Sequence, residues 1–124
     1  MKRDWDIVRE ILCKLEDLES TDDIVRLSDF PVERAFEYSY NMELLIEAGL
    51  VDGQMSKTLG RGAAHFMARR LTWVGHEFLD AVRSNTVWSK TKRTFAEQGL
   101  GMTFDMAKTV ATRFALAMIP GLPG

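Results

Sequence analysis

The chain has 124 residues, 46% of them hydrophobic and 27% charged, which is the composition of one globular domain and excludes general disorder. A single cysteine, Cys13, excludes an internal disulfide framework and fits a reducing compartment. No apolar run approaches the roughly 20 residues of a membrane span, and no apolar segment follows the first basic residues, so we expect a cytoplasmic protein without a signal peptide.

The formal net charge of −2 conceals an uneven distribution. Residues 1–50 hold six basic and thirteen acidic side chains, whereas residues 51–124 hold ten basic and five acidic ones. Such a polarity can orient an anionic ligand or favour head-to-tail contact between copies. The alternative is that charges are distributed unevenly by chance, as in any short chain.

The first half of the chain predicts two helices. Apolar residues at three- and four-residue steps predict a helix over residues 4–18. Residues 24–27 are a β-branched run that fits a small strand or the start of a short helix. A second helix is predicted from Pro31 to about Ala48, and Gly49 should end it in the left-handed conformation.

The second half predicts a hairpin followed by helices. Strands over residues 50–55 and 64–71 flank a loop that contains Gly60 and Gly62. Thr72 stands where the N-cap of the next helix belongs. The helix that Thr72 begins is predicted to have Val74, Phe78, Leu79, Ala81 and Val82 on one side, and later helices are predicted over residues 86–97 and 103–118.

This order of elements indicates an α+β fold, a winged helix-turn-helix with a small β-hairpin wing and additional C-terminal helices. Residues 1–101 would form the winged-helix domain, and residues 102–124 an amphipathic helix and tail that belong to the same domain or form a dimer. The expected core contains these residues: Trp5, Leu12, Leu44, Leu45, Leu50, Leu71, Trp73, Phe78 and Leu79.

Three segments carry a resemblance to a known family. They are Met-Lys-Arg-Asp at residues 1–4, Leu-Leu-Ile-Glu-Ala-Gly-Leu at residues 44–50, and residues 71–90, which run from Leu-Thr-Trp-Val-Gly-His to Trp-Ser-Lys. Over nearly its whole length the chain resembles the YjcQ-like family of small bacterial and prophage proteins. The resemblance implies a winged-helix fold and a link to mobile elements, and it implies no reaction.

The hairpin carries the first candidate site. Gly60-Arg61-Gly62 places one guanidinium on a flexible tip, where it could enter a minor groove, and neighbouring cations could neutralise phosphates. The expected nucleic-acid-binding residues are Lys57, Arg61, Arg69 and Arg70. The alternative is that the glycines only form the turn and the arginines are solvated.

The helix predicted over residues 31–48 would be the recognition helix, and it is acidic. It carries four carboxylates against one cation: Glu33, Glu37, Glu43 and Glu47 against Arg34. Phosphates would repel these carboxylates, which argues against ordinary major-groove binding. The candidates for contact with base edges or with a protein partner are Glu37, Tyr38, Tyr40 and Asn41. The alternative is that one tyrosine is core and the others are solvated.

No catalytic or metal-binding constellation is predicted. His65 and His76 have no partner at a ligand spacing, and one cysteine cannot complete a zinc site. A glycine-rich phosphate loop and a nucleophile elbow are both missing from the sequence. We expect a protein that is not an enzyme and that uses no metal or cofactor.

The last predicted helix, residues 103–118, has a wide apolar face. It could close the domain or form a homodimer, with or without the first helix, and this is favoured over contact with a membrane surface because its polar face is poor in Lys and Arg. For the whole protein we predict a nucleic-acid-binding regulator, by analogy with other winged helices. The acidic helix and a pI near 5.7 support the alternative, a protein–protein interaction module.

Overall fold

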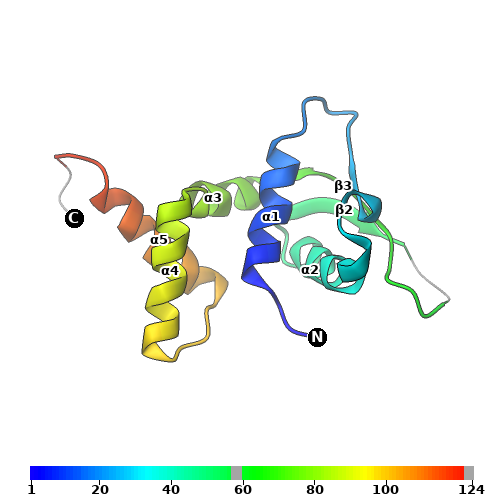
Figure 1. The fold of residues 1–124 in the computed structure, drawn as a ribbon. Coiled ribbons are helices and arrows are strands. Elements are labelled where there is room, and N and C mark those ends of the chain that lie inside the picture. Colours follow the sequence, from blue (N-terminus) through cyan, green and yellow to red (C-terminus); the bar gives the residue numbers. More distant parts are fainter. Residues whose placement is uncertain (57–59, 122–124) are drawn as a thin grey trace. The chain divides into compact units, whose positions relative to one another are not determined.

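The structure, a computed structural model, describes residues 1–56 and 60–121. The described residues form five α-helices, two short 3₁₀ helices and one antiparallel sheet of three strands, so the fold is α+β as predicted (Figure 1). The chain divides into two compact units, residues 1–76 and residues 77–124.

The first unit begins with helix α1, Trp5–Glu16. The Asp4 carboxylate accepts hydrogen bonds from the backbone N–H groups of Asp6 and Ile7, at 2.9 and 3.1 Å, and so satisfies two donors that a helix start leaves free. The predicted apolar stripe is confirmed, since one face of α1 is buried: Ile7, Val8, Ile11, Leu12 and Leu15. This face explains why α1 packs against both α2 and β3.

A short connection leads from α1 to helix α2. Strand β1, Val25–Arg26, is followed by the 3₁₀ helices η1, Leu27–Asp29, and η2, Val32–Arg34, and then by α2, Ala35–Glu47. Both alternatives for residues 24–27 are therefore realised, first a strand and then a short helix. Gly49 has a φ of 80°, as predicted for the left-handed residue after a helix.

The predicted hairpin is confirmed, although it contains a feature that the sequence did not reveal. Strands β2, Val51–Met55, and β3, Phe66–Leu71, pair with each other, and β1 pairs with the other edge of β3. Asp52 lies opposite Arg70, but Gly53 lies opposite Ala68, so Arg69 is the extra residue of a β-bulge.

A close junction joins the end of α2 to helix α3, Trp73–Val82. Thr72 caps α3 as predicted, because its hydroxyl accepts the Gly75 N–H at 3.1 Å and donates to the Gly49 carbonyl at 2.5 Å. A Cβ at Gly75 would collide with the backbone carbonyl of Leu50. Only glycine therefore lets the first turn of α3 approach β2 so closely.

The second unit contains the end of α3 and two further helices, α4, Asn85–Gln98, and α5, Phe104–Ala117. The hydroxyls of Ser84 and Thr103 cap α4 and α5, and Gly99, with a φ of 65°, ends α4. α4 and α5 pack against each other, and Phe78 stacks on Phe104 with 4.9 Å between ring centroids. α5 packs on α4 within this unit, and the assignment of residues 102–124 to the same domain or to a dimer contact stays a prediction.

The expected core needs correction at Trp73. Its side chain is 79% exposed, because it lies nine residues from the buried Val82 and hence on the opposite side of α3. Trp5 and Leu44 are only partly buried. Six of the predicted core residues are buried, four in the first unit and two in the second: Leu12, Leu45, Leu50, Leu71, Phe78 and Leu79.

Candidate interaction surfaces

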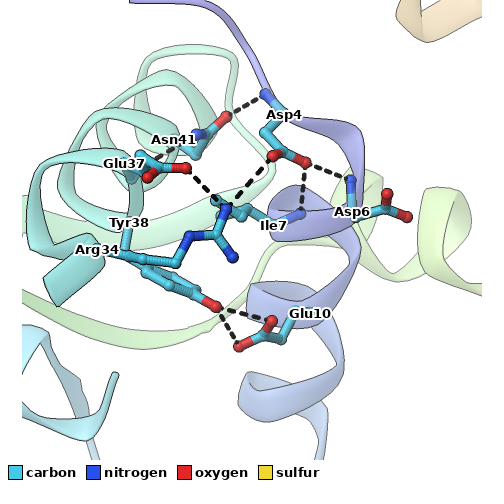
Figure 2. Close-up of polar contacts among 8 residues, drawn as sticks. All are labelled: Asp4, Asp6, Ile7, Glu10, Arg34, Glu37, Tyr38 and Asn41. Atoms are coloured by element: carbon cyan, nitrogen blue, oxygen red, sulfur yellow. Dashed lines mark hydrogen bonds and ion pairs between the residues drawn. The ribbon is translucent and has the colours of Figure 1, made fainter. Parts of the chain in front are cut away.

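Three buried polar side chains hold α2 in place, each by a contact with a different segment. The Tyr38 hydroxyl donates to Glu10 of α1 and lies 2.9 Å from both carboxylate oxygens (Figure 2). The Ser39 hydroxyl donates to the Ala64 carbonyl, at the foot of β3, at 2.7 Å. Asn41, the third of these residues, is 1% exposed.

Asn41 joins α2 to the segment before α1. Its amide oxygen accepts the Asp4 N–H at 2.9 Å, and its amide nitrogen donates to the Glu37 carbonyl at 2.8 Å. A buried amide whose two ends are both bonded fixes the distance between the segments that it joins. The same Asp4 caps α1 with its side chain, so Asn41 positions the start of α1 relative to α2.

Arg34 completes this cluster. Its guanidinium donates to the Glu37 carboxylate at 2.7 Å and lies 3.7 Å from the carboxylate of Asp4, so that it stands between the two acids in Figure 2. The hydrogen bond lowers the pKa of Glu37 and raises that of Arg34. Arg34 is the one basic residue between residues 31 and 48, and it is engaged by carboxylates of the protein itself.

Burial alters the chemistry of Tyr38. Desolvation, aided by the hydrogen bond to Glu10, raises the pKa of its hydroxyl to about 12. The ring stacks on Phe30, with 4.5 Å between centroids. Tyr38 is therefore a neutral, fixed part of the contact between α1 and α2.

This geometry divides the four residues predicted to contact base edges or a partner. Tyr38 and Asn41 are inside the fold with their polar groups satisfied, while Glu37 and Tyr40 are partly exposed. A ligand could reach Glu37 and Tyr40 without disturbing α2, but it could not reach the other two. The sequence left one core tyrosine as an alternative, and it could not identify Tyr38 or Asn41 as internal because their partners, Glu10 and the backbone of Asp4, are distant in the chain.

The outer face of α2 and η2 combines apolar and acidic side chains. Val32 of η2 is 84% exposed and Phe36 of α2 is 56% exposed, whereas Met42 of α2 is buried. Exposed carboxylates accompany them: Glu33, Glu43 and Glu47. Neither Val32 nor Phe36 was among the predicted contact residues, although their four-residue spacing placed them on one helical face with Tyr40.

The hairpin presents the predicted arginines at two separate places. Arg61 is exposed in the loop between β2 and β3, and Arg69 and Arg70 are exposed near the other end of β3. Lys57 lies outside the described residues. Arg70 is partly engaged, since its Nε lies 3.4 Å from the Asp52 carboxylate. Arg69, the extra residue of the bulge, extends the cationic surface without displacing Leu71 from the core.

One more cation belongs to this side of the sheet. Arg26 of β1 lies opposite Met67 of β3, which in turn lies opposite Gln54 of β2, and all three side chains are exposed. Successive side chains of a strand point to opposite faces of the sheet, and residues that pair across strands point to the same face. Arg26 therefore lies on the exposed face of the sheet, together with Met67 and Arg70. Sequence reasoning missed it because the pairing of β1 with β3 joins segments about 40 residues apart.

The described histidine and cysteine side chains belong to no metal-binding group. Within residues 1–56 and 60–121, no group of three His, Cys, Asp or Glu side chains is arranged to hold a metal ion. His65 and His76 are both exposed, and Cys13 is partly buried. In the same part of the chain, no helix has the length and apolar character needed to cross a membrane.

Comparison with known proteins places the chain in a family. The family described as "Hypothetical protein (DUF2513)" matches residues 2–101. A Haemophilus influenzae protein named "Uncharacterized protein" is 35% identical over 119 residues, which cover 96% of this chain and 99% of that protein. No solved structure matches the chain. Because the family match covers most of its length, this chain belongs to the DUF2513 family.

Proposed function

We propose that this protein is a non-catalytic winged-helix protein that binds nucleic acid through its β2–β3 hairpin. The element order, from α1 through β1 and α2 to the hairpin, and the strand order β1-β3-β2 support the winged-helix assignment. The observation that carries nucleic-acid binding is the β-bulge, which exposes the consecutive cations Arg69 and Arg70.

The mode of binding follows from where the charges lie. α2 exposes carboxylates, and Arg34, the one basic residue between residues 31 and 48, is engaged by Asp4 and Glu37, so phosphates would repel α2 from a major groove. The hairpin arginines would bind phosphates, with Arg61 able to enter a minor groove. Because Tyr38 and Asn41 are buried, few side chains remain to read base edges. Binding should therefore be weak, nearly independent of sequence, and steeply reduced by salt.

A duplex-binding titration at two salt concentrations tests this proposal. The variants are Arg61→Glu and the pair Arg69→Glu/Arg70→Glu, and the matched control for the single reversal is Arg83→Glu, an exposed arginine of the second unit that pairs with Asp80. The hairpin variants should lose affinity across all sequences, and the slope of log K against log salt should become shallower by roughly one per lost phosphate contact. A wild-type protein that fails to bind duplex at low salt would refute nucleic-acid binding.

One observation favours a second candidate, a protein-interaction module. The outer face of η2 and α2 exposes Val32 and Phe36 among glutamates, and grouped apolar side chains on a surface often mark a binding site. A photo-crosslinking residue at position 36, compared with one at position 67 on the sheet, would test it. Crosslinks to one protein at position 36 alone would support this candidate, and equal crosslinking at both positions would contradict it.

The biological setting is a further part of the proposal. The resemblance of residues 44–50 and 71–90 to the YjcQ-like family supports an association with prophages or other mobile elements. The single cysteine supports a cytoplasmic location. The exposed side chains of α5, including Met106 and Leu116, support a homodimer formed through residues 103–118.

A further inference from the structure

Trp73, the first residue of α3, exposes its aromatic side chain to solvent. It is 79% exposed, more than any other aromatic side chain in the described part of the chain. The turn that carries it is fixed, since the Thr72 hydroxyl accepts the Gly75 N–H and donates to the Gly49 carbonyl. An aromatic ring on a fixed turn loses little freedom when a ligand stacks on it. The indole is therefore suited to a flat ligand.

A groove next to Trp73 contains the two arginines of the bulge. It lies between the end of α1, the turn that follows α1 and the junction of β3 with α3, and its volume is about 510 Å³. Arg69, Arg70 and His76 line it. His76 follows Trp73 by one turn of α3, so the two side chains are neighbours on the surface of the helix. Trp73 therefore borders the groove.

Charge alone does not select the ligand of this groove. Glu16 and Glu19 line it together with the two arginines, so a bare phosphate would bind there only weakly. The indole of Trp73 adds a contact that a bare phosphate cannot use, because an aromatic ring stacks on the face of a nucleic-acid base. A nucleotide whose base is unpaired uses both the arginines and the indole.

We propose that this surface prefers single-stranded nucleic acid, with phosphates on Arg69 and Arg70 and a base stacked on Trp73. Arg70 and Trp73 are three residues apart, so at most about 11 Å of backbone separates them. The bases of a duplex are already paired and stacked, and only an unpaired base offers its face to the indole. Stacking accepts any base, so the preference is for strandedness and not for sequence. This inference rests on the proposed function and names the form of nucleic acid that the hairpin binds best.

Affinities of the full chain for a single strand and for a duplex separate the two contacts. The probes are a labelled oligothymidylate of roughly 12 nucleotides, which forms no hairpin, and its duplex with oligodeoxyadenylate, measured by fluorescence anisotropy at low salt. Trp73→Ala should weaken binding of the single strand about tenfold and binding of the duplex by less than about twofold. Arg69→Glu should weaken binding of both probes, because both carry phosphates.

Two further variants show whether stacking is the cause. Phe36→Ala removes another exposed aromatic side chain, on the acidic α2, and should leave both affinities unchanged. Trp73→Phe keeps an aromatic face and should retain most of the affinity for the single strand. The other two tryptophans, Trp5 and Trp88, are partly buried and buried. Oligothymidylate should therefore quench the tryptophan emission of the wild type and leave that of Trp73→Phe unchanged.

The contrary outcomes distinguish this inference from the proposed function. If the wild type binds single strand and duplex equally, or if Trp73→Ala weakens both or neither, stacking is overturned while nucleic-acid binding stands. Wild-type emission that saturating oligothymidylate leaves unchanged also overturns stacking, and this result does not depend on whether Trp73→Ala folds. A wild type that binds neither probe at low salt refutes nucleic-acid binding itself, and this inference with it.

Discussion

The hydroxyl of Tyr38 lies 2.9 Å from both carboxylate oxygens of Glu10, although 28 residues separate them in the chain. This contact makes α2 a fixed element whose outer face alone is available to a partner. Because the contact involves a tyrosine hydroxyl, it should also make the free energy of unfolding fall as the pH rises above 10.

Tyr38→Phe should reveal that dependence. The folded protein raises the pKa of Tyr38 from 10.0 to about 12, so the neutral hydroxyl stabilises the fold fully below pH 10. Above pH 10 the unfolded chain ionises first, and the stabilisation is lost as the pH rises towards 12. At pH 7 the variant should lose about 1–2 kcal/mol in urea unfolding. The difference between wild type and variant should shrink between pH 10 and 12, and a constant difference would contradict this origin.

Asn41→Ala should act on stability and not on a binding surface. The substitution removes both hydrogen bonds of a buried amide and leaves the Asp4 N–H without its partner, so the free energy of unfolding should fall by about 1–3 kcal/mol. Gln54→Ala, at an exposed position, is the control and should change it by less than about 0.5 kcal/mol. Equal effects of the two substitutions in urea unfolding would show that the Asn41 contacts contribute little.

Gly75→Ala tests the junction between α3 and β2. A methyl group at position 75 would overlap the Leu50 carbonyl, so the backbone must shift, and we expect a loss of about 1–3 kcal/mol in thermal or urea unfolding. Gly62→Ala adds the same methyl group where no atom lies within 4 Å. It should be nearly neutral, and a Gly75→Ala protein as stable as Gly62→Ala would contradict the close approach.

Arg69→Ala and Arg70→Ala separate the two cations of the bulge. Arg70 is already paired with Asp52 at 3.4 Å, so its removal frees a carboxylate but takes away a cation that was partly neutralised. If the hairpin binds duplex, Arg69→Ala should reduce the salt slope by roughly one, and Arg70→Ala should reduce it by less. The titration at several salt concentrations measures both slopes, and a larger effect at Arg70 would reverse the assignment.

Local signals account for the parts of the fold that the sequence predicted well. The caps of helices, such as Thr72 before α3 and Gly49 after α2, depend on backbone groups a few residues away, and both are confirmed. The stripe of α1 and the two strands of the hairpin follow from periodicity within one segment. These features can be recognised without knowing which segments meet.

The misses depend on contacts between distant segments. Tyr38 and Asn41 were candidates for contact with base edges or a partner, with one core tyrosine as the alternative, and only the positions of Glu10 and Asp4 show that both are internal. Trp73 looked like core because it is large and apolar, but the first turn of α3 turns it outward. Arg26 lies on the same face of the sheet as Arg70 because β1 pairs with β3, and this pairing of distant segments cannot be recognised from the sequence.

The bulge separates the charge of the hairpin from the packing beneath it. Phe66, Ala68 and Leu71 are buried, and Met67 and Arg70 point outward, in a strict alternation that ignores Arg69. Removing position 69 would leave that alternation unchanged, whereas removing a residue from a regular strand would turn every following side chain to the other face. A hairpin of this kind can therefore vary from one arginine to two by a single-residue insertion or deletion, while its buried face keeps the same residues.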